Sequence, residues 1–239
     1  MTGPAGLRRF VPGVQRPDSP PDPAAPVLPD APAAVLERIR AAKGAGAPPE
    51  QACEMCAAEI PPGHGHVADL ERSSLLCTCR ACYLLFEHSE AGGGRYRAVP
   101  DRYLRDPAHP MTEADWDELE IPVGLAFFLR SSQAGQVAGF YPSPAGPTEC
   151  RLDLGAWDRI ARAHPLLGAV EPDVEAALVA RTDDGIEHFL VPIDACYELA
   201  GRMRMLWKGF DGGTEARQGI AEFLAGVRSR ARALGQEPS

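Results

Sequence analysis

The cysteines of this 239-residue chain have a spacing typical of a metal site. Five of the seven are clustered: Cys53 and Cys56 form one CxxC pair, Cys79 and Cys82 form a second, and Cys77 stands two positions before it. Each CxxC pair turns two thiolates toward one point, and two such pairs supply the four soft ligands of a tetrahedral Zn²⁺ ion. The spacing predicts a zinc site with the four paired cysteines as ligands, and iron as the alternative metal.

Three further metal donors lie in the same stretch, namely Cys77, His64 and His66. They are surplus to four-coordination and are alternates for a single site; Cys77 can replace Cys79, because CxC spacing also ligates. A closed shell of four thiolates leaves no position for water or substrate, whereas catalytic zinc keeps one open. The predicted site is therefore structural, and an enzyme would need one of the two histidines as a ligand in place of a thiol.

Three functions fit a four-thiolate centre. The favoured one is a zinc ribbon or treble clef that serves a noncatalytic, protein-binding accessory factor. The second is a rubredoxin-like iron site for electron transfer, although Ala57 and Tyr83 stand where rubredoxin knuckles carry glycine. The third is a metal-dependent nuclease, because the segment 64–69 followed by 75–77 resembles an HNH endonuclease with paired knuckles; Tyr83 replaces the asparagine expected there.

The remaining sequence contains no P-loop, GxGxxG, GxSxG or HExxH motif, so no enzyme class is indicated. A proline-rich loop and an aromatic stripe are the candidates for contact with a partner protein. A stiff loop with aromatic residues presents a binding surface at a low entropy cost. The predicted partner-binding residues are Tyr141, Pro142, Pro144 and Glu149 in the loop, and Trp207 and Phe210 in the stripe.

Composition divides the chain into four segments. Residues 1–30 form a proline-rich tail, because prolines remove amide donors and prevent helices and sheet ladders. A short helix and linker occupy 31–48, and the zinc-knuckle module occupies 49–91. A module of about 40 residues is too small to fold by burial alone. A glycine run at 92–94 is the predicted hinge to an α+β domain at 95–235.

The later domain reads as mixed α and β structure. Thr112 and Asp115 form a capping box that opens a short helix. Apolar runs at 122–131 and 136–141, and at 174–181 and 187–191, predict two antiparallel hairpins. Two amphipathic helices close the chain. The predicted fold class is α+β: a small four-cysteine module, as ribbon or treble clef, followed by this domain.

Charge and cysteine usage limit the partners and the compartment. The formal net charge is −9 and the pI is about 5.2, which disfavours binding to nucleic acid phosphates. No segment approaches the roughly 20 apolar residues of a membrane span. Clustered cysteines in an odd total indicate a reducing compartment, where thiols bind metals rather than form disulfides. The expected location is the cytoplasm, with neither membrane nor nucleic acid as a partner.

Several segments also resemble a known bacterial family. They are the two knuckles and the runs Pro122–Phe128, Phe140–Gly146 and Leu190–Leu199. Together they look like a family of unassigned function found in gene neighbourhoods of nickel–iron uptake hydrogenases. The resemblance implies a role near hydrogenase assembly or electron handling, with a hydrogenase subunit or maturation factor as the expected partner. It supplies no active site.

Overall fold

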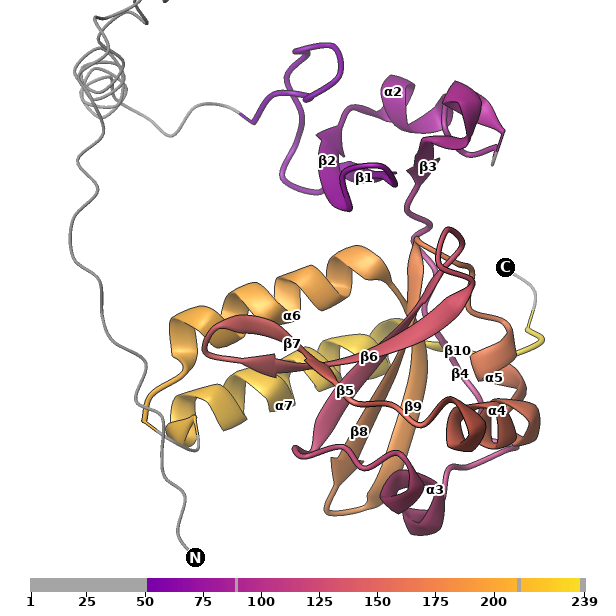
Figure 1. Cartoon of the computed structure of the whole chain (residues 1–239). Coiled ribbons are helices and arrows are strands. Elements are labelled where there is room, and N and C mark those ends of the chain that lie inside the picture. Colours follow the sequence, from indigo (N-terminus) through magenta and orange to yellow (C-terminus); the bar gives the residue numbers. More distant parts are fainter. Residues whose placement is uncertain (1–50, 89, 210–211, 237–239) are drawn as a thin grey trace, which may run out of the picture. The chain divides into compact units, whose positions relative to one another are not determined.

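The computed structural model describes residues 51–88, 90–209 and 212–236. The predicted proline-rich tail (1–30) and the predicted helix and linker (31–48) lie outside these residues. Two sheets organise the described chain: a three-stranded sheet of order β2-β1-β3 and a seven-stranded sheet of order β10-β4-β9-β8-β5-β6-β7 (Figure 1). With its helices and antiparallel hairpins, the chain has the predicted α+β fold class.

The small sheet belongs to the cysteine module. Its strands β1 (Gly65–Asp69) and β2 (Ser74–Thr78) form an antiparallel hairpin, and helix α2 (Arg80–Leu84) follows directly. The first CxxC pair precedes this hairpin, and the second begins at Cys79, which is the N-cap of α2. A knuckle, a hairpin and a helix whose first turn carries the second pair make a treble clef, one of the two predicted forms.

The small sheet does not end at the glycine run. It forms a 3-10 turn, η1 (Ala91–Gly94), with positive φ at Gly92 and Gly93, where glycine avoids the steric cost of a Cβ. Strand β3 (Tyr96–Ala98) comes after it, yet pairs antiparallel with β1. From residue 49 onward the chain forms one compact unit. The small sheet therefore extends past the predicted hinge. Separate folding of residues 49–91 and 95–235 stays a prediction.

The large sheet is antiparallel except at one edge, where β10 pairs parallel with β4. Both predicted hairpins are present, β5–β6 and β8–β9. The predicted loop after Tyr141 is itself a hairpin, in which Pro142 and Pro147 are opposite partners. Neither proline has an amide hydrogen to donate. Because the two prolines are paired with each other, the amides of the other strand residues keep their partners. The strands are β4 (Leu104–Arg105), β5 (Leu125–Ser131), β6 (Gln136–Ser143), β7 (Gly146–Cys150), β8 (Glu175–Thr182), β9 (Gly185–Pro192) and β10 (Arg232–Ala233).

Helices cover both faces of the large sheet, as Figure 1 shows. One face packs against α6 (Ile193–Leu206) and α7 (Gly213–Arg230). The other packs against α3 (Glu113–Glu118), α4 (Leu154–Ala163) and α5 (Pro165–Gly168). Successive strand residues point to opposite faces, so the neighbours Phe127 and Phe128 enter different cores. This explains why the central strands read as continuous apolar runs rather than alternating ones.

Local signals fix the helix starts. The Thr112 side chain accepts a hydrogen bond from the Asp115 amide at 3.2 Å, and the Asp115 carboxylate accepts one from the Thr112 amide at 2.7 Å. This is the predicted capping box. Asp153 caps α4 with its side chain alone, which accepts from the amides of Gly155 and Ala156. Both caps satisfy amides that the first turn of a helix leaves unpaired.

The small sheet is tied to the large one by apolar and polar contacts. Ala68, Val99 and Val174 are buried together between them. The Arg97 guanidinium donates to the Pro172 carbonyl at 3.0 Å and also forms an ion pair with the Glu171 carboxylate. The cysteine module is therefore anchored through its own sheet, beyond the covalent connection along the chain.

A buried histidine on β9 makes the fold sensitive to mild acid. Burial, with a smaller contribution from the nearby His164, lowers the pKa of His188 from 6.5 to about 4. As the pH falls from 6.5 toward 4, the unfolded chain takes up a proton that the folded chain does not, so stability is lost. Four titratable groups face it: His164, Asp106, Asp115 and His109.

We expect His188→Gln to remove this acid sensitivity. Between pH 7 and pH 5 the free energy of unfolding of the original chain should fall by about 2 kcal/mol more than that of the variant. Denaturant unfolding at the two pH values measures the difference. His88→Gln, at an exposed position, is the control and should behave like the original chain. Parallel pH dependence of the original chain and His188→Gln would show that His188 does not carry the effect.

Candidate metal centre

The four paired cysteines converge on one point. One sulfur from each of Cys53, Cys56, Cys79 and Cys82 lies within 4.8 Å of the other three, and the sulfurs of Cys56 and Cys79 are 3.6 Å apart. Sulfurs bound to one Zn²⁺ at about 2.3 Å stand about 3.8 Å apart in a tetrahedron. The donor set and its spacing thus fit a tetrahedral metal ion, and the four residues predicted as one ligand set are together in the structure.

Backbone geometry turns the first pair inward. The amide of Ala57 donates to the Cys53 carbonyl at 2.8 Å, and the amide of Cys53 donates to the Ala58 carbonyl at 2.7 Å. Ala57 has a positive φ of 60°, a conformation that L-residues seldom adopt. These two bonds close the tight turn that the sequence signals only as CxxC.

The second pair comes from the start of a helix. The Cys79 sulfur accepts a hydrogen bond from the Cys82 amide at 3.5 Å, as the side chain of a helix N-cap does. One helical turn then brings the Cys82 sulfur back to the same side. The short helix α2 therefore positions both thiols of the second pair.

The sulfurs differ in their affinity for protons. Burial raises the pKa of Cys53, but hydrogen bonds from the backbone amides of Cys79, Cys56 and Met55 outweigh it and bring the pKa to about 6. Hydrogen bonding to the Cys56 thiol, together with burial, raises the pKa of Cys82 to about 12. Four thiols this close cannot all ionise without a cation among them, because like charges repel at short range.

The module around these sulfurs has little apolar core. Only Cys53, Ile60 and Cys82 are buried there among the described residues, with Met55, Cys77 and Cys79 partly buried against them. The two apolar residues at the end of α2, Leu84 and Leu85, are 43% and 64% exposed rather than packed on the cysteines. Burial alone contributes little here, and a metal ion on the four cysteines would add stability to this segment.

The three surplus donors form a cluster of their own. One ring nitrogen of His64, one of His66 and the sulfur of Cys77 lie within 4.8 Å of one another. Cys77 is thereby placed with the two histidines, while Cys79 is placed with the other three cysteines. Sequence reasoning treated all three as alternates for a single site and missed this grouping. The available signal was the two-residue spacing of His64 and His66, which favours one face of an extended segment. Cys77 joins them only through the hairpin register, which pairs it with His66.

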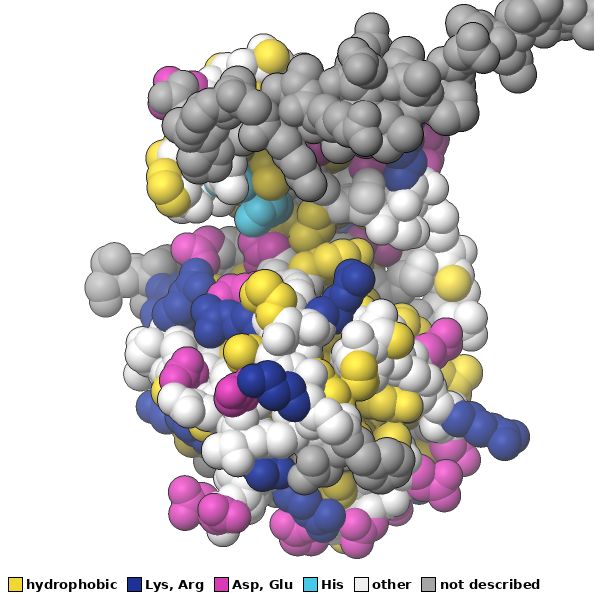
Figure 2. Space-filling view, turned by 90° about the vertical axis from the view of Figure 1, so that its left-hand side faces the viewer, with side chains coloured by type: hydrophobic (Ala, Val, Ile, Leu, Met, Phe, Trp, Pro, Cys, Tyr) yellow, Lys and Arg dark blue, Asp and Glu magenta, His cyan; other side chains and the backbone are white. Residues whose placement is uncertain are grey.

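A cleft opens beside this second cluster. It has a volume of about 770 Å³, and its lining includes His64, His66 and Cys77 from the module and Asp194 and Glu198 from α6. Figure 2 shows histidine side chains at a hollow in the surface, with acidic and basic side chains nearby. The volume falls within the range of about 300–1,000 Å³ that small-molecule pockets occupy.

The predicted partner-binding residues are spread over two elements. Tyr141, half-buried, and Pro142, buried, lie on β6; Pro144 and Glu149 are exposed in the β6–β7 hairpin. Trp207 is half-buried against the core, and its indole nitrogen donates to the Gly209 carbonyl at 3.0 Å. Phe210 lies outside the described residues. Contact of these positions with a partner stays a prediction.

Comparison with known proteins places the chain in a family. Within the described residues, none of the helices has the length and apolar character needed to cross a bilayer. A search of the curated proteins and a search of the solved structures each found no match. One protein-family description does match, "Family of unknown function (DUF5947)", over residues 52–231. That span contains both CxxC pairs, all described helices and every described strand except β10. The chain belongs to the DUF5947 family.

Proposed function

We propose that this protein is a zinc-stabilised accessory factor that binds another protein and performs no catalysis at its four-cysteine centre. The observation that carries the proposal is the convergence of Cys53, Cys56, Cys79 and Cys82 on one point. A metal held by four thiolates has no open position for water or substrate, so its role is to hold the chain in shape. Zinc is the metal that most often has this role.

Iron in the same centre is the alternative, and the amide hydrogen bonds to the Cys53 sulfur suit either metal. The two are separated by colour and redox behaviour. We expect the purified chain to contain zinc at this centre and to be colourless, because Zn²⁺ has a filled d shell and no redox chemistry. A red sample that bleaches on reduction, with iron in equal amount to the chain, would instead support electron transfer.

The nuclease alternative has the order of two strands and a helix in its favour, since β1, β2 and α2 follow one another. An HNH-like nuclease needs a metal-binding side chain at the helix position that Tyr83 occupies here. Its hydroxyl donates to the Val99 carbonyl at 3.0 Å, and its ring lies over Gly65, where a Cβ would be 2.6 Å from Tyr83 Cδ2. Tyr83 is therefore engaged in holding the module together, which favours the accessory role.

For the partner, we propose a hydrogenase subunit or maturation factor. This part rests on the resemblance to a family from hydrogenase gene neighbourhoods and on side chains that are apolar yet exposed. Tyr197 and Met205 on α6 are 48% and 76% exposed, in addition to Leu84 and Leu85 on α2. Tyr and Met are among the residues enriched in protein interfaces relative to the rest of the surface.

Capture from the native cell tests the partner. The tagged full chain should retain a hydrogenase subunit or maturation factor, and the paired variant Tyr197→Ser with Met205→Ser should retain at least tenfold less. Equal retention by both would place the contact elsewhere. The absence of any hydrogenase-related protein from the captured material would remove the hydrogenase part of the proposal.

A further inference from the structure

We propose that His64, His66 and Cys77 bind a second divalent metal ion, separate from the four-cysteine centre and open to the cleft. Zn²⁺ is the expected ion, with water as its fourth ligand. Two imidazoles and one thiolate suit metals of borderline softness such as Zn²⁺ and Co²⁺. This site goes beyond the proposed accessory function and does not depend on it.

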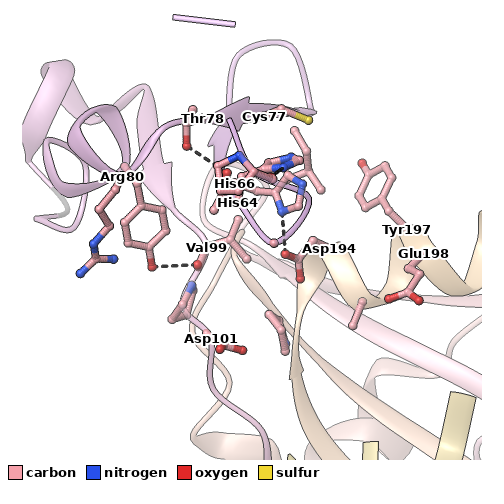
Figure 3. A pocket seen from close by; sticks show the side chains of 18 of the residues that line it. His64, His66, Cys77, Thr78, Arg80, Val99, Asp101, Asp194, Tyr197 and Glu198 are labelled. Carbon is pink, nitrogen blue, oxygen red and sulfur yellow. Dashed lines mark hydrogen bonds and ion pairs between the residues drawn. The ribbon is translucent and has the colours of Figure 1, made fainter. Parts of the chain in front are cut away.

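The hairpin β1–β2 brings the three donors together. His66 and Cys77 are directly opposite each other in its antiparallel register. Opposite residues have Cβ atoms about 4.5–5.5 Å apart, close enough for one ion to lie between their side chains. His64 precedes β1 and is two positions from His66, so it reaches the same side, and its ring centroid is 4.9 Å from that of His66. Figure 3 shows the three side chains gathered above Asp194.

Both histidines are held by hydrogen bonds at Nδ1. The His66 Nδ1 lies 2.8 Å from the Asp194 carboxylate, and the His64 Nδ1 lies 2.9 Å from the Pro61 carbonyl (Figure 3 shows the Asp194 contact). A carbonyl or carboxylate oxygen only accepts, so Nδ1 must carry the proton in both rings. Each Nε2 then holds a lone pair that can bind a metal. A histidine ligand with its other nitrogen on a carboxylate or carbonyl is the usual arrangement in metal sites.

The His64 Nε2 has no partner within the described residues, although it is buried. Buried polar atoms are nearly always hydrogen-bonded, because leaving one unpaired costs about 1–3 kcal/mol. A metal ion beside Cys77 and His66 would satisfy this nitrogen. The unpaired atom and the cluster of donors are independent observations that indicate the same ligand.

Three protein donors leave one coordination position open. Catalytic zinc sites have this composition, three protein ligands and a water, whereas structural sites have four protein ligands. The three donors line the cleft of about 770 Å³, so a fourth ligand can enter from solvent. Glu198 and Tyr197 line the same cleft.

Cobalt binding to the full chain loaded with one equivalent of zinc, which the four thiolates of the first centre take up, tests this site. After equilibration with Co²⁺ and removal of unbound metal, we expect two metal ions per chain, zinc plus cobalt, and a new visible absorption from one thiolate and two imidazoles. Cys77→Ser and His66→Ala should each hold one ion and lack this absorption. His88→Ala, which removes an exposed histidine of the module outside the cluster, is the matched control and should behave like the original chain.

Asp194 acts here as a positioning residue, and Asp194→Asn checks that role. The variant should weaken Co²⁺ binding by about 10–100-fold while the spectrum at saturation keeps its ligand set. Retained zinc in the four-cysteine centre and an unchanged circular dichroism spectrum show that each variant is folded. Two ions per chain in Cys77→Ser, or no new absorption in the original chain, would overturn the proposal. Absence of zinc from the four-cysteine centre in the original chain would count against the accessory function. The cobalt spectrum would still test the second site by itself.

Discussion

Cys79→Ser is expected to release the metal of the four-cysteine centre and to unfold the module, whereas Cys77→Ser should leave both intact. A structural zinc contributes about 10–16 kcal/mol of apparent binding free energy at neutral pH, and the three buried residues around these sulfurs cannot replace it. Amide hydrogen exchange measures the outcome by segment. Protection in 51–98 should be lost in the first variant and retained in the second.

The large sheet should keep its protection in both variants. Its buried strands have cores on both faces that do not include the five clustered cysteines. The contacts of Arg97 with the Glu171 carboxylate and the Pro172 carbonyl will be lost when the module unfolds. Loss of protection throughout the chain would show that the two sheets fold as one unit. Equal damage from Cys77→Ser would show that it is a ligand of the first centre.

Phe128→Ala should destabilise the large sheet by about 3–5 kcal/mol, the usual range for removing a buried aromatic ring. Phe128 is 1% exposed, and its ring packs in a tilted arrangement on Trp157 of α4, with 4.6 Å between centroids. It also lies against Gly139, where an added Cβ would approach the ring to 3.0 Å. The neighbouring elements are thus fitted closely around it and cannot collapse into the space left.

Phe86→Ala is the matched control for this prediction. Phe86 is half-buried and packs on Tyr96 at 5.3 Å between centroids, away from the large sheet. Denaturant unfolding of the two variants, followed at the tryptophans, should show a large loss of stability only for Phe128→Ala. A similar loss in both would mean that the module and the large sheet share one unfolding transition.

Local signals in the sequence predict much of the fold. The capping box at Thr112 and the hairpin of the runs 174–181 and 187–191 depend on residues close together in the chain, and the structure has both. The four ligands are predicted because their spacing encodes two turns of fixed geometry. These features follow from chemistry within a short window of chain, which a single sequence contains in full.

Long-range pairing is what the sequence does not contain. Strand β10 has two residues and pairs with β4, more than a hundred positions away, and β3 joins the module from beyond the glycines. Strands this short have no periodicity to detect. Asp194 lies in the first turn of α6, and its carboxylate contacts His66 of β1. That contact joins residues 128 positions apart, so only the folded chain brings it about.

The central claim is that four cysteine sulfurs hold one zinc ion with no other ligand. X-ray absorption at the zinc edge tests it most directly, on the Cys77→Ser variant so that only the first centre contributes. We predict four sulfur neighbours at about 2.3 Å and no nitrogen or oxygen neighbour. A first shell with nitrogen or oxygen, or iron in place of zinc, would contradict the account.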